Sequence, residues 1–187
     1  MPDGAPDRIE ERAVVIVGAG LVGLTLAIDL KLRGIDVLVL EKGDRVSEGS
    51  RSICQAQRTL EIWDRLGVGE AVRDRGVQWS RGRVFHGARE LFSFDLSADA
   101  EAKMPAFVNL QQYHVEALLH ARLAELGGEV RATHSLTGLV ARKDGVLAEV
   151  GTPRGNYRID CQWLVSCEGV RSVARRTLDL AFDGQTF

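Results

Sequence analysis

A glycine pattern near the N-terminus constrains this chain more than any other feature. The apolar run Ala13–Val17 is short and rich in β-branched residues, which predicts a strand buried on both faces. It leads directly into Gly18, Gly20 and Gly23, spaced as G-x-G-x-x-G. In this pattern the first glycine permits a tight turn, the second lets a pyrophosphate approach the backbone, and the third lets the next helix pack on the strand. The pattern therefore predicts a diphosphate site at a helix N-terminus, where free N–H groups stabilise negative charge.

The residues after the glycines complete a strand–helix–strand unit. The apolar positions within Leu24–Leu32 predict a helix that ends at Gly34, and Ile35–Leu40 predicts a second buried strand. Glu41 then follows, about twenty residues after the glycines, where a carboxylate accepts hydrogen bonds from the ribose hydroxyls of an adenosine. Because Glu41 would repel a 2′-phosphate, we expect FAD or NAD rather than NADP in this site. An ordinary strand–turn–helix without a ligand is the alternative, which the combination of features disfavours.

Composition excludes several kinds of partner. A net charge of −2 gives no electrostatic reason to expect nucleic acid or an anionic membrane. No apolar run approaches the length of a membrane span, and the polar start shows no signal-peptide pattern, so we expect a cytoplasmic protein. Three cysteines without C-x-x-C spacing fit a reducing compartment. His114 and His120 lie on different faces of a predicted helix, so no metal site is expected.

A family resemblance appears in the segment after the nucleotide unit. The run SRSICQAQRTLEIWDRLGV spans residues 50–68, and its apolar spacing predicts a helix that ends at Gly67. Together with the glycine pattern and Glu41–Lys42, it resembles the N-terminal part of the flavoprotein aromatic hydroxylases, the FAD monooxygenases typified by para-hydroxybenzoate hydroxylase. The resemblance implies that Arg51 contacts FAD, and that Gln112, at the start of a predicted helix within Val108–Leu126, contacts the flavin. A surface charge at Arg51 and a helix cap at Gln112 are the alternatives.

Residues Val77–Leu96 change to a strand-like period. Two alternating stretches, Trp79–Phe85 and Glu90–Leu96, flank a turn at His86–Ala88 and predict a β-hairpin. In the resembling family such strands begin the substrate-binding sheet, which is inserted into the FAD domain. A partial sheet of this kind leaves apolar faces and open edges exposed, so we expect a tendency to self-associate.

The C-terminal third contains a second candidate site. Short β-rich runs between residues 129 and 161 predict an antiparallel ribbon, and Trp163–Cys167 predicts a buried strand that turns at Glu168–Gly169 into a helix. This turn resembles the family's Asp-Gly motif, which helps to hold the FAD pyrophosphate and is tied to the reduced nicotinamide nucleotide. Glu168 stands where the family has Asp, whereas Gly169, Arg171 and Ser172 match. A plain strand–helix turn is the alternative.

These observations predict an α/β fold, namely a glutathione-reductase-like Rossmann FAD-binding domain with a β-ribbon crossover and a partial antiparallel substrate sheet. The expected parts are a flexible arm (1–12), an FAD-binding βαβ unit with following helices (13–76), the first substrate-domain strands (77–106) and the remainder of the FAD domain (107–187). The predicted cofactor-binding residues are Gly18, Gly20, Leu21, Val22, Gly23, Glu41, Lys42, Arg51, Gln112, Glu168, Gly169, Arg171 and Ser172.

The resemblance implies the FAD-binding portion of a monooxygenase that hydroxylates a small aromatic substrate with dioxygen and NADH or NADPH. The later Gly-Asp motif of the family is missing, so we expect the chain to be incomplete and too short to be active alone. A related FAD dehydrogenase or halogenase and a non-catalytic nucleotide-binding fragment are the alternatives. The sequence identifies no catalytic residue, and the substrate stays open.

Overall fold

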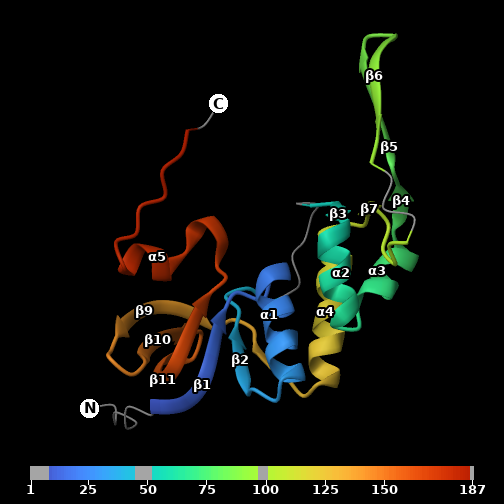
Figure 1. Cartoon of the computed structure of the whole chain (residues 1–187). Helices are drawn as coiled ribbons and strands as arrows, with labels where there is room; N and C mark the ends of the chain where they lie inside the picture. Colours follow the sequence, from blue (N-terminus) through green and yellow to red (C-terminus); the bar gives the residue numbers. More distant parts are fainter. Residues whose placement is uncertain (1–8, 45–51, 97–100, 186–187) are drawn as a thin grey trace. The chain divides into compact units, whose positions relative to one another are not determined.

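The structure, a computed structural model, describes residues 9–44, 52–96 and 101–185. They fall into two compact units, and Figure 1 labels most of their helices and strands. The first unit contains residues 1–46 and 123–187 of the chain, and the second contains residues 47–122.

The first unit is built on a six-stranded sheet with the strand order β8-β2-β1-β11-β10-β9. The strands β8, β2, β1 and β11 run parallel to one another, whereas β10 is antiparallel to both of its neighbours, β11 and β9. Its strands and helices are β1 (Ile9–Val17), α1 (Leu21–Leu32), β2 (Val37–Leu40), β8 (Glu129–Arg131), β9 (Ser135–Ala141), β10 (Val146–Thr152), β11 (Gly155–Ser166), the 3₁₀-helix η1 (Gly169–Arg171) and α5 (Val173–Thr177).

The apolar run of β1 is buried on both faces from Val14 to Val17, as its composition predicts, whereas its first residue, Ala13, is exposed. Val15 and Ile16 are completely buried, and successive strand residues point to opposite faces. Val15 belongs to a hydrophobic cluster with residues of β9, β10 and β11, such as Val150 and Ile159. On the other face, the Cβ of an alanine at Gly23 in α1 would lie 3.3 Å from the side chain of Ile16. The predicted strand–helix–strand unit is therefore confirmed, although β2 begins at Val37 and the Ile35 predicted to belong to this buried strand is exposed.

Strand β1 begins at Ile9, before the apolar run that starts at Ala13. Residues Ile9–Arg12 pair with residues 158–161 of β11, although every residue of this stretch after Ile9 is charged. The charged side chains of Glu10 and Arg12 form ion pairs with each other, and Glu10 also pairs with Arg131 of β8. These contacts extend the strand through residues that composition alone assigns to a flexible arm.

Strand β11 is one long element where the sequence predicts two strands. Residues 155–161 pair with β10, and the pairing with β1 continues to Ser166. Trp163 is 69% exposed, which contradicts the prediction of a buried strand over Trp163–Cys167. The last β10 partner is Val146, opposite Cys161, so β10 does not cover the edge of β11 beyond that point.

The second unit contains a small antiparallel sheet with the strand order β3-β7-β4. Trp79 of β4 stacks on Phe107 of β7 with ring centroids 4.9 Å apart, and its Nε1 donates to Asn109 Oδ1 at 2.9 Å. Its elements are β3 (Cys54–Ala56), α2 (Gln57–Arg65), α3 (Gly69–Arg75), β4 (Val77–Trp79), β5 (Arg81–His86), β6 (Arg89–Asp95), β7 (Phe107–Asn109) and α4 (Gln112–Glu125), whose last three residues are counted with the first unit. The helix predicted within Val108–Leu126 begins at Gln112, because β7 precedes it.

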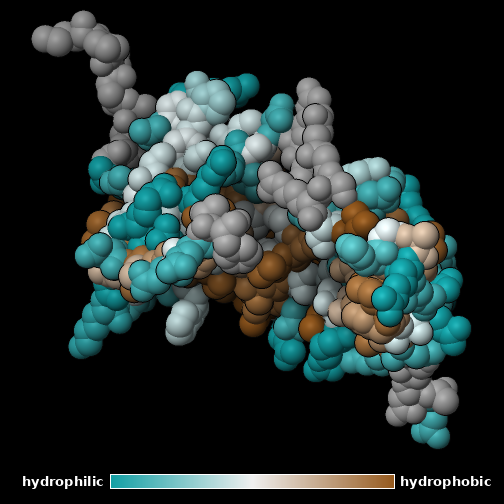
Figure 2. All heavy atoms as spheres, turned by 90° about the horizontal axis from the view of Figure 1, so that it is seen from above, coloured by the Kyte–Doolittle hydropathy of each residue, from teal (hydrophilic) through white to brown (hydrophobic). Residues whose placement is uncertain are grey.

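The predicted hairpin is confirmed as β5 and β6, with its turn at Gly87–Ala88. Val84 lies opposite Phe92, and Gly82 lies opposite Phe94, so these residues share one face. Phe92 and Phe94 are 56% and 38% exposed. Figure 2 colours hydrophobic residues brown and shows that some of them reach the surface of the molecule.

The broad fold prediction is confirmed, because the chain is a mixed α/β structure whose main sheet combines parallel and antiparallel strands. Among the described residues, no helix is both long enough and apolar enough to cross a membrane.

Candidate functional site

Gly18 makes the turn that leaves β1. Its backbone has a φ of 108°, a conformation that side chains with a Cβ rarely adopt. Its N–H donates to the carbonyl of Leu40 at 2.7 Å, and a Cβ at this position would lie 2.5 Å from the carbonyl oxygen of Cys167. The turn therefore requires glycine, because β2 and the segment after β11 both approach it closely.

The other two glycines of the pattern differ sharply in their surroundings. A Cβ at Gly23 would lie 1.9 Å from the carbonyl oxygen of Gly18, so only glycine lets α1 pack this closely on the turn. A Cβ at Gly20 would meet no atom within 4 Å. Gly20 is the N-cap of α1, with a φ of −79° and no side-chain cap. The first N–H groups of α1, including those of Leu21 and Val22, have no partner within the helix. Open space thus lies beside a helix N-terminus.

Glu41 joins this turn from the end of β2. One carboxylate oxygen accepts a hydrogen bond from the N–H of Ala19 at 2.8 Å, and the other accepts from the N–H of Gly43 at 2.8 Å. A carboxylate offers about four acceptor positions, so these two bonds leave positions for ribose hydroxyls. Lys42, the next residue, is exposed.

Glu168 closes the N-terminus of α5. Its carboxylate accepts from the N–H groups of Val173 and Ala174 at 3.0 and 3.1 Å, and from the hydroxyls of Ser166 and Ser172 at 2.9 and 2.8 Å. Burial raises the pKa of Glu168, but these hydrogen bonds outweigh it and hold the pKa below its ordinary value. The carboxylate therefore occupies the N–H groups that an external anion would need.

The neighbours of Glu168 differ in exposure. Ser172 is buried, and its hydroxyl also accepts from the N–H of Arg175, as an N-cap does. Gly169 has a φ of 70°, and Arg171 is exposed. Since the carbonyl of Cys167 packs against Gly18, the structure brings this turn beside the glycine loop.

Two predicted site residues belong elsewhere in the chain. Gln112 begins α4 in the second unit, where its amide donates to Glu116 at 2.7 Å. Arg51 lies outside the described residues.

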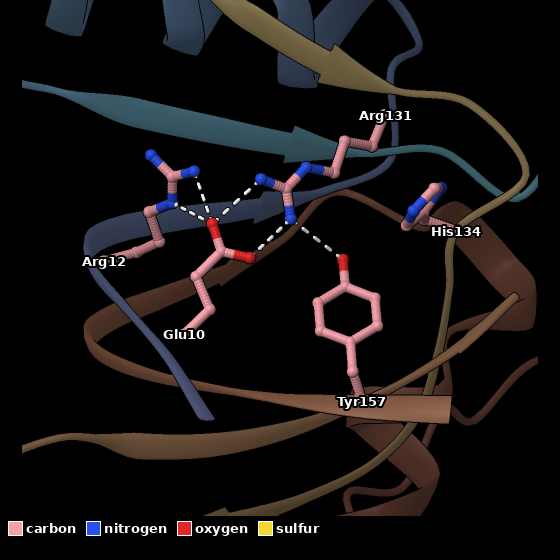
Figure 3. A pocket seen from close by; sticks show the side chains of 5 residues that line it. All are labelled: Glu10, Arg12, Arg131, His134 and Tyr157. Carbon is pink, nitrogen blue, oxygen red and sulfur yellow. Dashed lines mark hydrogen bonds and ion pairs between the residues drawn. The ribbon is translucent and has the colours of Figure 1, made fainter. Parts of the chain in front are cut away.

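Sequence reasoning missed a polar pocket in the first unit, shown in Figure 3. It is a cavity of about 480 Å³ lined by Glu10, Arg12, Arg131, His134 and Tyr157. Arg131 donates to both carboxylate oxygens of Glu10, at 2.7 and 2.8 Å, and to the hydroxyl of Tyr157 at 3.1 Å. These partners lie as far as 121 positions apart, so no short pattern could have revealed them. Among the described residues, those of this pocket included, no group of three or more His, Cys, Asp or Glu side chains could hold a metal ion.

The geometry around α1 fits a dinucleotide such as FAD. The open space at Gly20 admits a pyrophosphate to N–H groups that no side chain caps. The free acceptor positions of Glu41 suit the two hydroxyls of a ribose, and the fingerprint residues lie in one unit. The residues that are present therefore fit the adenosine diphosphate half of FAD.

Comparison with known proteins agrees with this fit. A family model described as "FAD binding domain" matches residues 11–186. The chain is 36% identical over 172 residues to 12-dehydrotetracycline 5-monooxygenase/anhydrotetracycline 6-monooxygenase of Streptomyces rimosus, a match that covers 92% of this chain and 33% of that protein. It is 33% identical to para-nitrophenol 4-monooxygenase of a Pseudomonas species, covering 93% of this chain and 44% of the relative.

Solved structures show the same similarity. The crystal structure of p-nitrophenol 4-monooxygenase from Pseudomonas putida superposes with a TM-score of 0.90 at 30% identity, covering 96% of this chain and 46% of that one. This chain thus spans less than half the length of the relatives it matches. The chain belongs to the FAD binding domain family, in the group of flavin-dependent monooxygenases that resemble para-hydroxybenzoate hydroxylase.

Proposed function

We propose that the first unit binds the adenosine diphosphate half of FAD at the glycine loop. The observation that carries this proposal is the open space at Gly20, beside N–H groups that no side chain caps. Leu21 and Val22 would donate their N–H groups to the pyrophosphate, and Glu41 would accept from the ribose hydroxyls. Gly18 and Gly23 support the site by letting β2, the Cys167 segment and α1 approach one another.

The turn after β11 would support the same cofactor in a different way. Glu168 and Ser172 hold the start of α5, and this fixes the backbone of Gly169 beside the glycine loop. We propose that Gly169 and Arg171 contact the pyrophosphate or the reduced nicotinamide nucleotide, while Glu168 and Ser172 act as positioning residues. Direct contact between Glu168 and a phosphate is disfavoured, because both carry negative charge.

The remaining site assignments rest on the family resemblance. Arg51, Lys42 and Gln112 are proposed to contact FAD, Gln112 after exchanging its hydrogen bond to Glu116. At the level of the fold, we propose a glutathione-reductase-like Rossmann domain with β9 and β10 as the crossover ribbon and β5 and β6 as the first substrate-domain strands. The domain boundaries predicted from the sequence are part of this proposal, except that Ile9–Arg12 belong to β1 and not to the N-terminal arm.

We further propose that the protein to which this sequence belongs is a monooxygenase that hydroxylates a small aromatic substrate. Two relatives support this reaction class, because one is a 12-dehydrotetracycline 5-monooxygenase/anhydrotetracycline 6-monooxygenase and the other is a para-nitrophenol 4-monooxygenase. Bound FAD would supply the redox chemistry, by accepting hydride from NADH or NADPH and activating dioxygen. The three free cysteines are consistent with a cytoplasmic location.

Self-association through the hairpin is also proposed, because Phe92 and Phe94 expose one apolar face of a two-stranded element. Replacing Phe92 by Ser would lower the average mass in sedimentation experiments. An unchanged mass distribution would contradict self-association through the hairpin.

The test of cofactor binding is a titration with FAD, followed by flavin fluorescence. Gly20→Val would fill the open space and weaken binding at least tenfold, on the order of 1.4 kcal/mol. Its thermal stability would remain near that of the parent, because nothing lies within 4 Å of the new Cβ. Glu41→Ala would cost roughly 1.5–3 kcal/mol of binding if a charge-assisted hydrogen bond is lost.

Gly184→Val is the matched control for the FAD titration. Gly184 also has nothing within 4 Å of a new Cβ, and it lies in the segment after α5. This variant would bind FAD as the parent does. If Gly20→Val and Glu41→Ala also bound FAD as tightly as the parent, the site would be misassigned.

A further inference from the structure

Thr133, in the turn between β8 and β9, has an unusual backbone. Its φ is 59°, in the left-handed region. For a β-branched residue this conformation is an outlier, which persists only where the surrounding structure holds it. The hydroxyl of Thr133 donates to the carbonyl of Ala132 at 2.7 Å, and this hydrogen bond helps to hold the left-handed backbone of Thr133.

The turn around Thr133 forms backbone hydrogen bonds with Glu41 and with Gly43. The N–H of Thr133 donates to the carbonyl of Gly43, and the N–H of His134 donates to the carbonyl of Glu41, both at 2.9 Å. The N–H of Glu41 in turn donates to the carbonyl of Arg131 at 2.9 Å. Three hydrogen bonds thus extend the contact of β8 with β2 past the end of both strands.

The Glu41 carboxylate depends on this backbone. One of its oxygens accepts from Gly43 N–H and the other from Ala19 N–H in the glycine loop, each at 2.8 Å. Gly43 is therefore held by its carbonyl to Thr133 and by its N–H to Glu41. If the Thr133 backbone moved to negative φ, its N–H would turn away from Gly43, and the support of the carboxylate on that side would be lost.

We propose that Thr133 is a positioning residue for Glu41, whose left-handed backbone fixes the carboxylate that receives the ribose hydroxyls. The proposal rests on the proposed function, in which Glu41 binds the adenosine ribose. Thr133 touches Glu41 through Gly43 and the turn backbone, and it is assigned no contact with the cofactor.

The experiment compares the binding of ADP and 2′-deoxy-ADP by calorimetry. The parent would bind ADP about tenfold more tightly, as expected for a hydrogen bond to a charged carboxylate. Thr133→Val keeps the β-branch but loses the hydroxyl, so its left-handed backbone is less well held, and the preference would fall to about threefold or less. Thr133→Asn is the matched control, because Asn tolerates the left-handed region, and it would keep the parent's preference.

The preference ratio separates positioning from general stability. A merely structural role of Thr133 would lower the melting temperature of Thr133→Val while leaving the ratio at the parent's value, and this result would overturn the proposal. If Thr133→Val does not fold, Thr133→Ala disturbs the same conformation less and replaces it in the experiment. Its preference for ADP over 2′-deoxy-ADP would then also have to fall to about threefold or less. A parent that binds ADP and 2′-deoxy-ADP equally would instead contradict the ribose assignment of Glu41, and with it the proposed function.

Discussion

Glu10 provides the sharpest test of how the first unit is held together. Its carboxylate accepts two hydrogen bonds from Arg131, at 2.7 and 2.8 Å, and one from Arg12 Nε at 2.7 Å. The side chains of Glu10 and Arg131 are 25% and 21% exposed, so solvent screens the pair only in part. The hydrogen bonds of Arg131 lower the pKa of Glu10 most, burial opposes them, and Arg12 lowers it further, to about 2.

The lowered pKa of Glu10 determines how much its charge contributes to folding stability and how that contribution changes with pH. A change from 4.5 to about 2 corresponds to roughly 3 kcal/mol, since each pKa unit equals about 1.4 kcal/mol. Because the folded-state pKa lies below the unfolded one, this stability is fully present above the unfolded value near 4.5 and is lost as the pH falls through about 2. We expect Glu10→Gln to lose about 2–3 kcal/mol at pH 7, because glutamine keeps the shape but removes the charge.

Urea unfolding followed by circular dichroism at pH 7, 5 and 2.5 measures this effect. The difference in unfolding free energy between the parent and Glu10→Gln would stay constant from pH 7 to pH 5 and shrink by pH 2.5. The control is Glu11→Gln at the exposed neighbouring position, expected to lie within about 0.5 kcal/mol of the parent. A difference that does not change between pH 5 and pH 2.5 would refute the assignment of the stability to the charge of Glu10.

Two further changes test the packing of the cofactor loop. Gly23→Ala would destabilise the chain by about 1–3 kcal/mol or more, because its Cβ would lie 1.9 Å from the carbonyl oxygen of Gly18, whereas Gly20→Ala would leave the stability of the ligand-free chain nearly unchanged. Thermal unfolding compares the two, and equal melting temperatures would contradict the packing argument. Glu168→Gln would cost about 1–2 kcal/mol at pH 7 by weakening the cap of α5, and the difference would shrink at low pH because the pKa of Glu168 is lowered. A loss that is the same at low and neutral pH would argue against a role for its charge.

Short-range patterns predicted the elements whose packing depends on near neighbours in sequence. The glycine spacing and the apolar runs around it predicted β1, α1 and β2, because each of these elements buries residues that recur with its own period. The alternation around Gly87 predicted the hairpin of β5 and β6, although every residue of β6 is exposed. In these segments the local pattern and the tertiary contacts favour the same structure.

The sequence failed where the deciding partner lies far along the chain. Residues Ile9–Arg12 read as a polar arm, yet they form a strand because Arg131 and β11 supply partners more than a hundred positions away. Thr133 carries no turn signal of the Gly or Asn type, and the hydrogen bonds of its turn end on Glu41 and Gly43. Neither contact leaves a periodic signature that reasoning from local spacing could detect.

The two helix N-termini that the sequence predicted as anion sites differ in what fills them. At α5, a five-residue helix, the protein supplies its own anion, because the Glu168 carboxylate accepts from the first N–H groups and Ser172 caps the helix. At α1 the N-cap is Gly20, which has no side chain to cap the helix, although Ser, Asp or Asn would do so better. The fold does not need glycine at that position, since its φ is negative and no atom lies within 4 Å of a Cβ. Gly18 and Gly23 are explained by the packing of the chain itself, so among the three glycines it is Gly20 whose identity points to a ligand.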